Sequence, residues 1–216
     1  MPLTFEQDAA LRAADPVRNG SGTGSTANSA RRLAERLAAQ DAGRARAREG
    51  DLLHQAGCML YWAEGAKSTN AVAFSNSDPH MIRFFVGFLR EACGVDEAAI
   101  VLTVNCHLGA GLTVQDIQKW WLEQAGLPER CLRKATVDRV SRASQTRGRF
   151  VPFGTARISV HSTRLVQEIY GAIQAYAEFE RPDWLLTPRT KDCVRRPAPG
   201  EWSGRWRRLP LRGSVG

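Results

Sequence analysis

The chain has 216 residues, of which 43% are hydrophobic, and its formal net charge is +8. This size allows one domain with a sizeable core and tails, or at most two small domains. A membrane protein is excluded because no apolar run approaches roughly 20 residues, and residues 1–10 lack the basic-then-apolar order of a secretion signal. We therefore expect a cytoplasmic protein, and we expect its five cysteines, which form no CxxC pair, to be reduced thiols.

The positive charge is unevenly distributed along the chain. Residues 51–128 hold 4 basic and 8 acidic side chains, whereas residues 129–186 hold 10 basic and 6 acidic ones. Residues 187–216 add 8 basic and 2 acidic side chains. Such an asymmetry favours a surface for an anionic partner, although ordinary solvated charge is an equally good interpretation.

The N-terminal region lacks the pattern of a packed domain. Residues 1–29 are expected to form a disordered tail, because residues 16–29 are rich in Gly and Ser and have nothing apolar to bury. Residues 30–50 are rich in Ala and Arg and predict a basic helix with a thin apolar stripe at Leu33 and Leu37. This marginal helix needs a partner surface or DNA to become stable. No second helix with a tight turn follows it, so a helix-turn-helix is not indicated.

From Asp51 onwards, apolar spacing and cap residues predict alternating helices and strands up to residue 186. Helices are expected over 51–63, 79–93, 113–125 and from Ser162 or Thr163 to about Tyr176. Strands are expected over 71–75, 99–106 and 155–160, with a basic strand or loop at 131–137 and an exposed basic loop at 141–150. Residues 51–186 therefore predict one α+β domain, and the Pro/Arg/Gly-rich residues 187–216 predict a disordered basic tail.

The most informative stretch is the end of the first of these helices. Residues 57–68 form an apolar helix end with a single carboxylate, Glu64, which Gly65 and Lys67 follow directly. The helix dipole disfavours a carboxylate at this position by a few tenths to about one kcal/mol. Lys67, a metal ion or solvent exposure must therefore compensate for the charge of Glu64.

Several stretches carry a resemblance to a known family. Residues 61–68 read Tyr-Trp-Ala-Glu-Gly-Ala-Lys-Ser, residues 76–79 read Asn-Ser-Asp-Pro, and residues 161–166 read His-Ser-Thr-Arg-Leu-Val. With these stretches, residues 50–186 resemble the LAGLIDADG homing-endonuclease-like superfamily, in a divergent single-motif form of an actinobacterial type. The resemblance implies a LAGLIDADG-like mixed helix and sheet domain, a motif helix that packs against its mate in a homodimer, and double-stranded DNA as the partner.

The resemblance also implies roles for the residues of the motif. Glu64 takes the place of the acid that binds a divalent cation near the scissile phosphate, which makes it the candidate metal ligand and Mg²⁺ the candidate cofactor. Lys67 is the second candidate catalytic residue, because it can contact phosphate or steady a water molecule. The simpler alternative is an exposed Glu64–Lys67 ion pair, worth under about 1 kcal/mol. Met59 occupies the place of the small residue expected midway along the helix, and the neighbouring Ala56 and Gly57 offer a different point of close approach.

A basic set in the second half is the candidate DNA-binding surface. Strand residues alternate between faces, so several of these side chains can project together from a sheet, and the loop among them can follow phosphates. The set consists of Arg130, Arg133, Lys134, Arg139, Arg142, Arg147, Arg149 and Arg157.

Three functions remain open from the sequence. The first is DNA binding without cleavage, by a homodimer that would act in the cytoplasm at the nucleoid. The second is a magnesium-dependent DNA endonuclease that uses Glu64 from each subunit. The third is an interaction module that binds no nucleic acid and whose basic residues only increase solubility.

Overall fold

The computed structural model describes residues 16–107, 111–138 and 151–185, including all of their side chains except those of 16–26, His107 and Asp138. The chain forms five α-helices within these ranges: α2 (Pro16–Ala47), α3 (Leu52–Glu64), α4 (Pro79–Gly87), α5 (Val114–Ala125) and α6 (Thr163–Tyr176). The strands are β1 (Val72–Asn76), β2 (Val101–His107), β3 (Thr136–Asp138) and β4 (Thr155–Val160). Short helical turns are η1 (Phe88–Ala92), η2 (Glu97–Ala99), η3 (Glu129–Cys131) and η4 (Pro182–Leu185).

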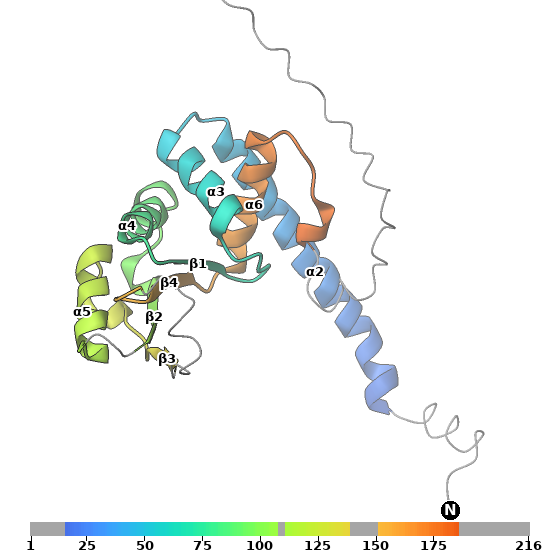
Figure 1. Cartoon of the computed structure of the whole chain (residues 1–216). Coiled ribbons are helices and arrows are strands. Elements are labelled where there is room, and N and C mark those ends of the chain that lie inside the picture. The colour runs from blue at the N-terminus through green and yellow to red at the C-terminus, as the bar shows by residue number, and fades with distance from the viewer. Residues whose placement is uncertain (1–15, 108–110, 139–150, 186–216) are drawn as a thin grey trace, which may run out of the picture.

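The four strands form one sheet in the order β1-β4-β2-β3. β4 pairs antiparallel with β1 and β2, and β3 pairs parallel with β2. The mixed sheet and its helices confirm the predicted α+β class. α4 and α5 pack against the sheet, and α3 and α6 lie beside β1, while the long helix α2 runs along α6 and extends away from the sheet (Figure 1).

The apolar side chains of the sheet face the layer of described helices. Phe74, Leu102 and Ile158 come from three adjacent strands and are completely buried against this helical layer. Residues of opposite parity, such as Ser75 and Arg157, point to the other face and are exposed. Because successive side chains in a strand alternate between faces, the second face is polar and open to solvent around Ser75 and Arg157. It is covered further along the same strands, where the paired Ala73 and Ser159 are 2% and 8% exposed.

The predicted helix starts are confirmed at the level of individual hydrogen bonds. Asp51, Asp78 and Ser162 cap α3, α4 and α6, each by accepting a backbone N–H from the first turn. Thr113 begins α5 with a reciprocal capping box, and Gly126 ends α5 in the left-handed conformation with φ +64°. The cap role of Asp78 leaves its carboxylate engaged with the backbone of the first turn.

α2 differs from the prediction in its length and in its place in the fold. Residues 16–29 were expected to form a linker, but helix α2 begins at Pro16 and continues through them. Gly and Ser favour coil, yet extending an existing helix adds one hydrogen bond for each residue that is ordered, and Pro is well tolerated in a first turn. The predicted tails at 1–15 and 187–216 lie outside the described residues.

α2 packs on the same core as the rest of the domain. Residues 30–50 were expected to form a basic helix separate from the domain. Gly43 packs against the backbone of Glu168, and Gly171 packs against the backbone of Gln40, so neither position has room for a Cβ. The partner surface that this thin apolar helix requires is therefore α6.

A buried amide network fixes how α2 and α6 are aligned. Gln40 donates to Gln167 over 2.8 Å and accepts from Gln174 over 3.1 Å, and all three side chains are at most 3% exposed. Gln167 also donates to the carbonyl oxygens of Thr69 and Trp184. Sliding one helix along the other would leave these amides unpaired in the core, which costs about 1–3 kcal/mol for each buried group.

Two smaller expectations also hold. Cys58, Cys93 and Cys131 are free thiols, and the helix expected over 79–93 is present as α4 followed by the π-helical turn η1, with Gly94 at φ +63° after it. In the part of the chain that the structure describes, no helix is both long and apolar enough to cross a membrane.

Candidate nucleic-acid interface

The C-terminal end of α3 is attached to the edge of the sheet. Gly65 forms an antiparallel bridge with Phe74 of β1, and the N–H of Ala66 donates to the carbonyl of Ala73 over 2.8 Å. The turn that follows Glu64 therefore adds a short extension beside β1. This contact places the helix-terminal acid at the β1 edge of the sheet.

A glycine is required directly after Glu64. Tyr61 is completely buried and donates its hydroxyl to the carbonyl of Ala66 over 2.6 Å, so its ring covers the turn. A Cβ at position 65 would overlap this ring. Burial raises the pKa of Tyr61 to about 12, which keeps the hydroxyl protonated as a donor at neutral pH. The motif Tyr-x-x-Glu-Gly is thus explained locally by packing.

Lys67 caps α3. Its ammonium donates to the carbonyl oxygens of Tyr61, Trp62 and Gly65 over 3.3, 2.6 and 2.9 Å. A cation at this end offsets the partial negative charge of the helix dipole. Partial burial lowers the pKa of Lys67, and the nearby charge of Glu64 opposes that shift. The expected direct ion pair between Lys67 and Glu64 does not form among the described contacts, because the ammonium is held by the backbone instead.

Lys67→Met should reduce stability by about 1 kcal/mol, because it keeps the aliphatic stem and removes the charge from three helix-terminal carbonyls. Urea denaturation followed by circular dichroism measures this change. Lys134→Met is the matched control, because Lys134 is exposed and lies in the segment between η3 and β3. Equal stability of the two variants would contradict the capping role.

Glu64 itself is exposed to solvent. If the register of the Gly65–Phe74 bridge is continued by one residue, Glu64 comes to stand opposite Ser75, which pairs with Arg157 of β4. The predicted acid therefore lies at the β1 edge of the sheet, and one predicted DNA-binding cation, Arg157, lies on the adjacent inner strand β4.

The donor set at Glu64 is sparse for a metal ion. No group of three or more His, Cys, Asp or Glu side chains converges within the described ranges. Mg²⁺ is commonly held by one or two carboxylates together with water and substrate phosphates, so Glu64 fits such a site when a phosphate and a second carboxylate join it. Lys67 already supplies the positive charge that the end of α3 requires.

The exposed part of the polar face of the sheet carries a regular array of small polar side chains around one cation. Two cross-strand rows are read directly from the pairing of the strands. These rows consist of Ser75, Arg157 and Thr103, and of Thr155, Asn105 and Thr136. Arg157 is exposed and makes no ion pair with any residue that the structure describes. Apart from Arg157, the prediction missed these residues, although the alternation of polar and apolar residues in 101–106 and 155–160 is the signal that identifies them.

Two of the other predicted arginines, unlike Arg157, have partners within the described chain. Arg130 forms an ion pair with Glu97, which Arg90 also contacts. Arg133 lies between η3 and β3, where its guanidinium donates to the carbonyls of Arg130 and Leu132. Arg133 therefore lies outside β3, and one nitrogen of its exposed guanidinium is held by the end of a 3-10 turn, while its role in DNA binding stays a prediction.

Of the remaining predicted cations, the structure describes only Lys134. Lys134 is exposed next to Arg133. Arg139, Arg142, Arg147 and Arg149 lie outside the described residues, so their predicted role stays a prediction. The flanking strands define where that segment begins and ends: β3 pairs with β2 at His107, and β4 starts opposite Asn105 of β2. Both flanks therefore lie at the same end of β2.

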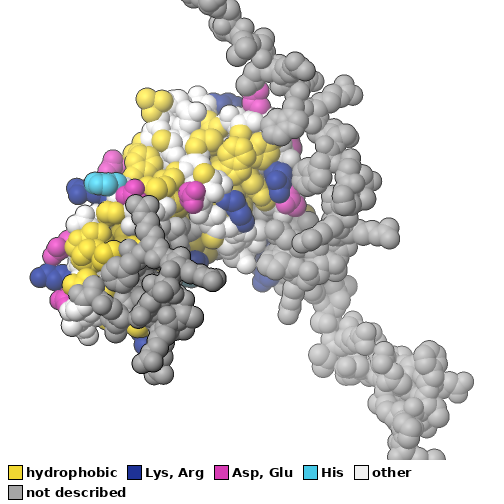
Figure 2. Space-filling model, viewed as in Figure 1, with side chains coloured by type: hydrophobic (Ala, Val, Ile, Leu, Met, Phe, Trp, Pro, Cys, Tyr) yellow, Lys and Arg dark blue, Asp and Glu magenta, His cyan; other side chains and the backbone are white. Residues whose placement is uncertain are grey.

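The outer side of α3 is apolar. Leu52 and Trp62 are 79% and 40% exposed, and Ala56 and Ala63 are also exposed, with Met59 half-buried between them. Hydrophobic side chains gather on the visible surface where α3 runs (Figure 2).

Gly57 does not contribute to this outer side, contrary to the prediction that it offers a point of close approach for a mate. It packs against the ring of Phe88, where a Cβ would overlap that ring. Ala56 remains available.

A search of protein families, of curated proteins and of solved structures finds no match to this chain. The resemblance to the LAGLIDADG superfamily therefore stays a prediction, and a function has to be argued from the geometry.

Proposed function

We propose that this protein binds double-stranded DNA through the exposed part of the polar face of its sheet, as a homodimer, and does not cleave it. The observation that supports this proposal most is the array around Arg157. Arg157, which forms no ion pair with any residue that the structure describes, stands among hydroxyl and amide side chains on the exposed part of this face. This composition suits phosphate and base-edge contacts, for which Arg, Ser, Thr and Asn are the usual donors.

The dimensions of the array suit a duplex. Antiparallel strands about 4.8 Å apart form a ribbon roughly 10 Å across, and the major groove of B-DNA is about 12 Å wide. β1, β4 and β2 can therefore present Ser75, Arg157 and Thr103 side by side to one stretch of DNA. The basic residues that flank the sheet, Lys134 among them, would add contacts to the backbone.

The outer side of α3 supports a second copy of the chain as partner. Leu52, Ala56, Met59 and Ala63 follow one another at the spacing of a helix side that packs against another helix. This stripe carries no charge before Glu64, so two copies related by a two-fold axis present matching surfaces. The small side chains of Ala56 and Ala63 allow close approach of the two helices.

The second candidate function is magnesium-dependent cleavage. The position of Glu64 at the sheet edge and at the end of the proposed dimer helix favours it, because two such carboxylates from two subunits would lie near the DNA. Mg²⁺ there would stabilise the charge that develops on the oxygens of the scissile phosphate. Glu64 would contribute one ligand, and Lys67, held by the carbonyls of α3, would not be free to assist.

Arg157→Ala should weaken binding to duplex DNA about tenfold and reduce the slope of log affinity against log salt by about one for each copy that contacts a phosphate. Fluorescence anisotropy at several salt concentrations measures both effects. The matched control is Arg83→Ala, which removes an exposed arginine from α4 on the covered side of the sheet. An equal loss in the two variants would show that only net charge matters.

A plasmid-nicking assay in Mg²⁺ separates the two candidate functions. DNA binding that persists in Glu64→Ala, without nicking by the wild type, supports binding without cleavage. Nicking that Glu64→Ala abolishes would instead establish the nuclease. The absence of any DNA affinity at low salt would leave an interaction module that binds no nucleic acid.

A further inference from the structure

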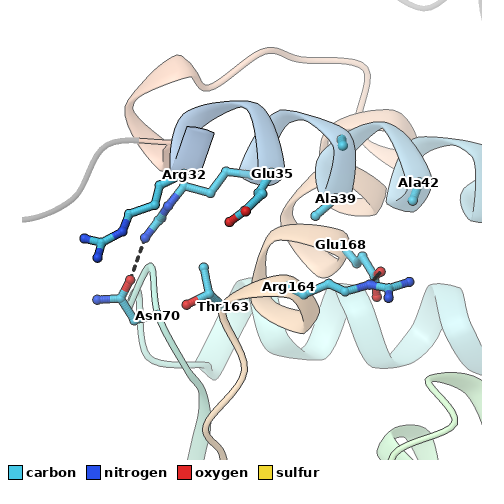
Figure 3. Close-up of a pocket in the computed structure, with 10 residues that line it drawn as sticks. Arg32, Glu35, Ala39, Ala42, Asn70, Thr163, Arg164 and Glu168 are labelled. Carbon is cyan, nitrogen blue, oxygen red and sulfur yellow. Dashed lines mark hydrogen bonds and ion pairs between the residues drawn. The ribbon is translucent and has the colours of Figure 1, made fainter. Parts of the chain in front are cut away.

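A groove lies between α2, the start of α6 and the loop that leads into β1. Its volume is about 800 Å³, and it is open to solvent on one side. Arg32, Arg36, Asn70, Thr163 and Arg164 contribute to its lining (Figure 3). Two helices and a loop that are far apart in the sequence thus bring Arg32 and Arg36 to one end of the groove, while Arg164 pairs with Glu168 at the other end (Figure 3).

Arg36 is the central residue of this groove. Its side chain is buried, with the whole residue 7% exposed, and it donates to the carbonyl of Thr69 over 3.1 Å and to Oδ1 of Asn70 over 2.6 Å. Both acceptors are uncharged. No carboxylate forms an ion pair with Arg36 among the described residues, so a full positive charge is buried without a counterion. Burial of an unpaired charge is costly, and a bound anion would remove that cost.

The charges around Arg36 make its positive charge less favourable, so a bound anion would stabilise it. Burial and the neighbouring charge of Arg32 both lower the pKa of Arg36. The two acids in the lining are already engaged: Glu168 with Arg164 at 2.7 Å, and Glu35 with Arg31 at 3.8 Å. Among the residues with described side chains, Arg32 and Arg36 line the groove without an ion pair to any carboxylate.

The groove lies beside the end of the sheet at which β1 begins and β4 ends. Asn70 is two residues before β1, and Thr163 follows β4 by three residues. From Arg157 along β4 to the residue that follows it, the side chains of one parity are those of Arg157 and His161, which are exposed, and of Ser159 between them, which is 8% exposed. Six residues of extended chain from Arg157 to Thr163 span about 20 Å, which corresponds to about six base-pair steps of a duplex. A duplex that contacts Arg157 would therefore have to pass over the covered segment at Ser159 to place a phosphate in the groove.

We propose that this groove binds a phosphate group, with Arg32 and Arg36 as its ligands and the N-terminus of α6 as a further positive end. The proposal extends the proposed function, because a phosphate of the DNA backbone is the occupant when DNA lies on the sheet. A free phosphate-bearing molecule presents the same chemistry and is distinguished by the test. Guanidinium groups bind phosphate through paired hydrogen bonds, and the described residues engage two of the five N–H donors of Arg36.

The test uses the full chain and inorganic phosphate, titrated against chloride at constant ionic strength. Phosphate should raise the melting temperature of the wild type, and Arg32→Ala should weaken phosphate affinity about tenfold in calorimetry. Arg83→Ala should behave like the wild type. Arg36→Lys should also weaken phosphate affinity, because it keeps the charge and removes the guanidinium group that donates paired hydrogen bonds. Circular dichroism verifies that this variant folds. A wild type that does not respond to phosphate, or an unchanged response in Arg32→Ala, overturns the site.

DNA binding identifies the source of the phosphate. A salt slope lower by about one for each copy in Arg32→Ala assigns the site to the DNA backbone. An unchanged slope together with lost binding of inorganic phosphate assigns it to a free phosphate-bearing ligand. If the wild type binds no DNA at all, the proposed function fails, while the phosphate titration still decides whether the site exists.

Discussion

Gly43→Ala is expected to lower the free energy of unfolding by about 3 kcal/mol, because the added methyl group overlaps the backbone of Glu168 at the crossing of α2 and α6. Neither helix can move away without breaking the amide network around Gln40. Thermal and urea unfolding measure the loss. The melting transition should also lose cooperativity if α2 detaches before the rest of the domain unfolds.

Gly87→Ala is the matched control for this prediction. Gly87 lies in α4 with helical backbone angles, and the nearest atom to an added Cβ is Oε1 of Glu91 at 3.8 Å. The same substitution should therefore stabilise the protein by about 0.5–1 kcal/mol, because alanine is the better helix former. Destabilisation of both variants to the same extent would contradict the proposed importance of the α2–α6 contact.

Ala56→Glu is expected to convert the proposed dimer into a monomer. Ala56 is exposed in the described chain, so the substitution leaves the fold intact, but it places two carboxylates face to face at the two-fold contact between α3 helices. Loss of simultaneous contact by two subunits should weaken DNA binding about 100-fold. Analytical ultracentrifugation and anisotropy measure the two effects.

Leu37→Glu controls for the charge that Ala56→Glu adds. Leu37 is 42% exposed on α2, away from the outer side of α3, and should remain dimeric when replaced. A monomeric wild type at the concentrations that bind DNA, or a dimer that survives Ala56→Glu, would show that α3 is not the contact.

Local signals allowed much of the fold to be predicted. Asp51, Asp78, Thr113 and Ser162 satisfy backbone N–H groups within their own first turns, so each helix start is encoded within a few residues. The same holds for the alternation in β4, which separates exposed Arg157 from buried Ile158.

Contacts between distant residues explain where the prediction failed. The fit of Gly43 against Glu168 and the pairing of Gln40 with Gln167 join segments over 120 residues apart, and neither glycine nor glutamine signals such a partner locally. The pairing of Arg130 with Glu97 spans 33 residues and has no local signal either.

The sequence predicted where the end of the motif helix lies better than it predicted the contacts that the side chains there make. The prediction placed Glu64 at the end of the motif helix, and the structure shows that helix end at the edge of the sheet. The cap that Lys67 forms depends on the path of the turn after Gly65, which no spacing reveals. Arg36 was missed because an arginine in a basic helix looks like all its neighbours until Thr69 and Asn70 bury it.

The interlocked amides of Gln40, Gln167 and Gln174 have a consequence for recognition. They make the separation between Arg36 on α2 and Arg157 on β4 a constant of the folded protein, since α6 follows β4 with only two intervening residues. A polyanion that contacts both arginines would therefore bind to two cations whose distance from one another is already fixed by the fold. Ligands with phosphates at that distance would bind without any ordering of the protein. Flexible polyanions would lose conformational entropy on binding, and polyanions with another phosphate spacing would have to change conformation to contact both arginines.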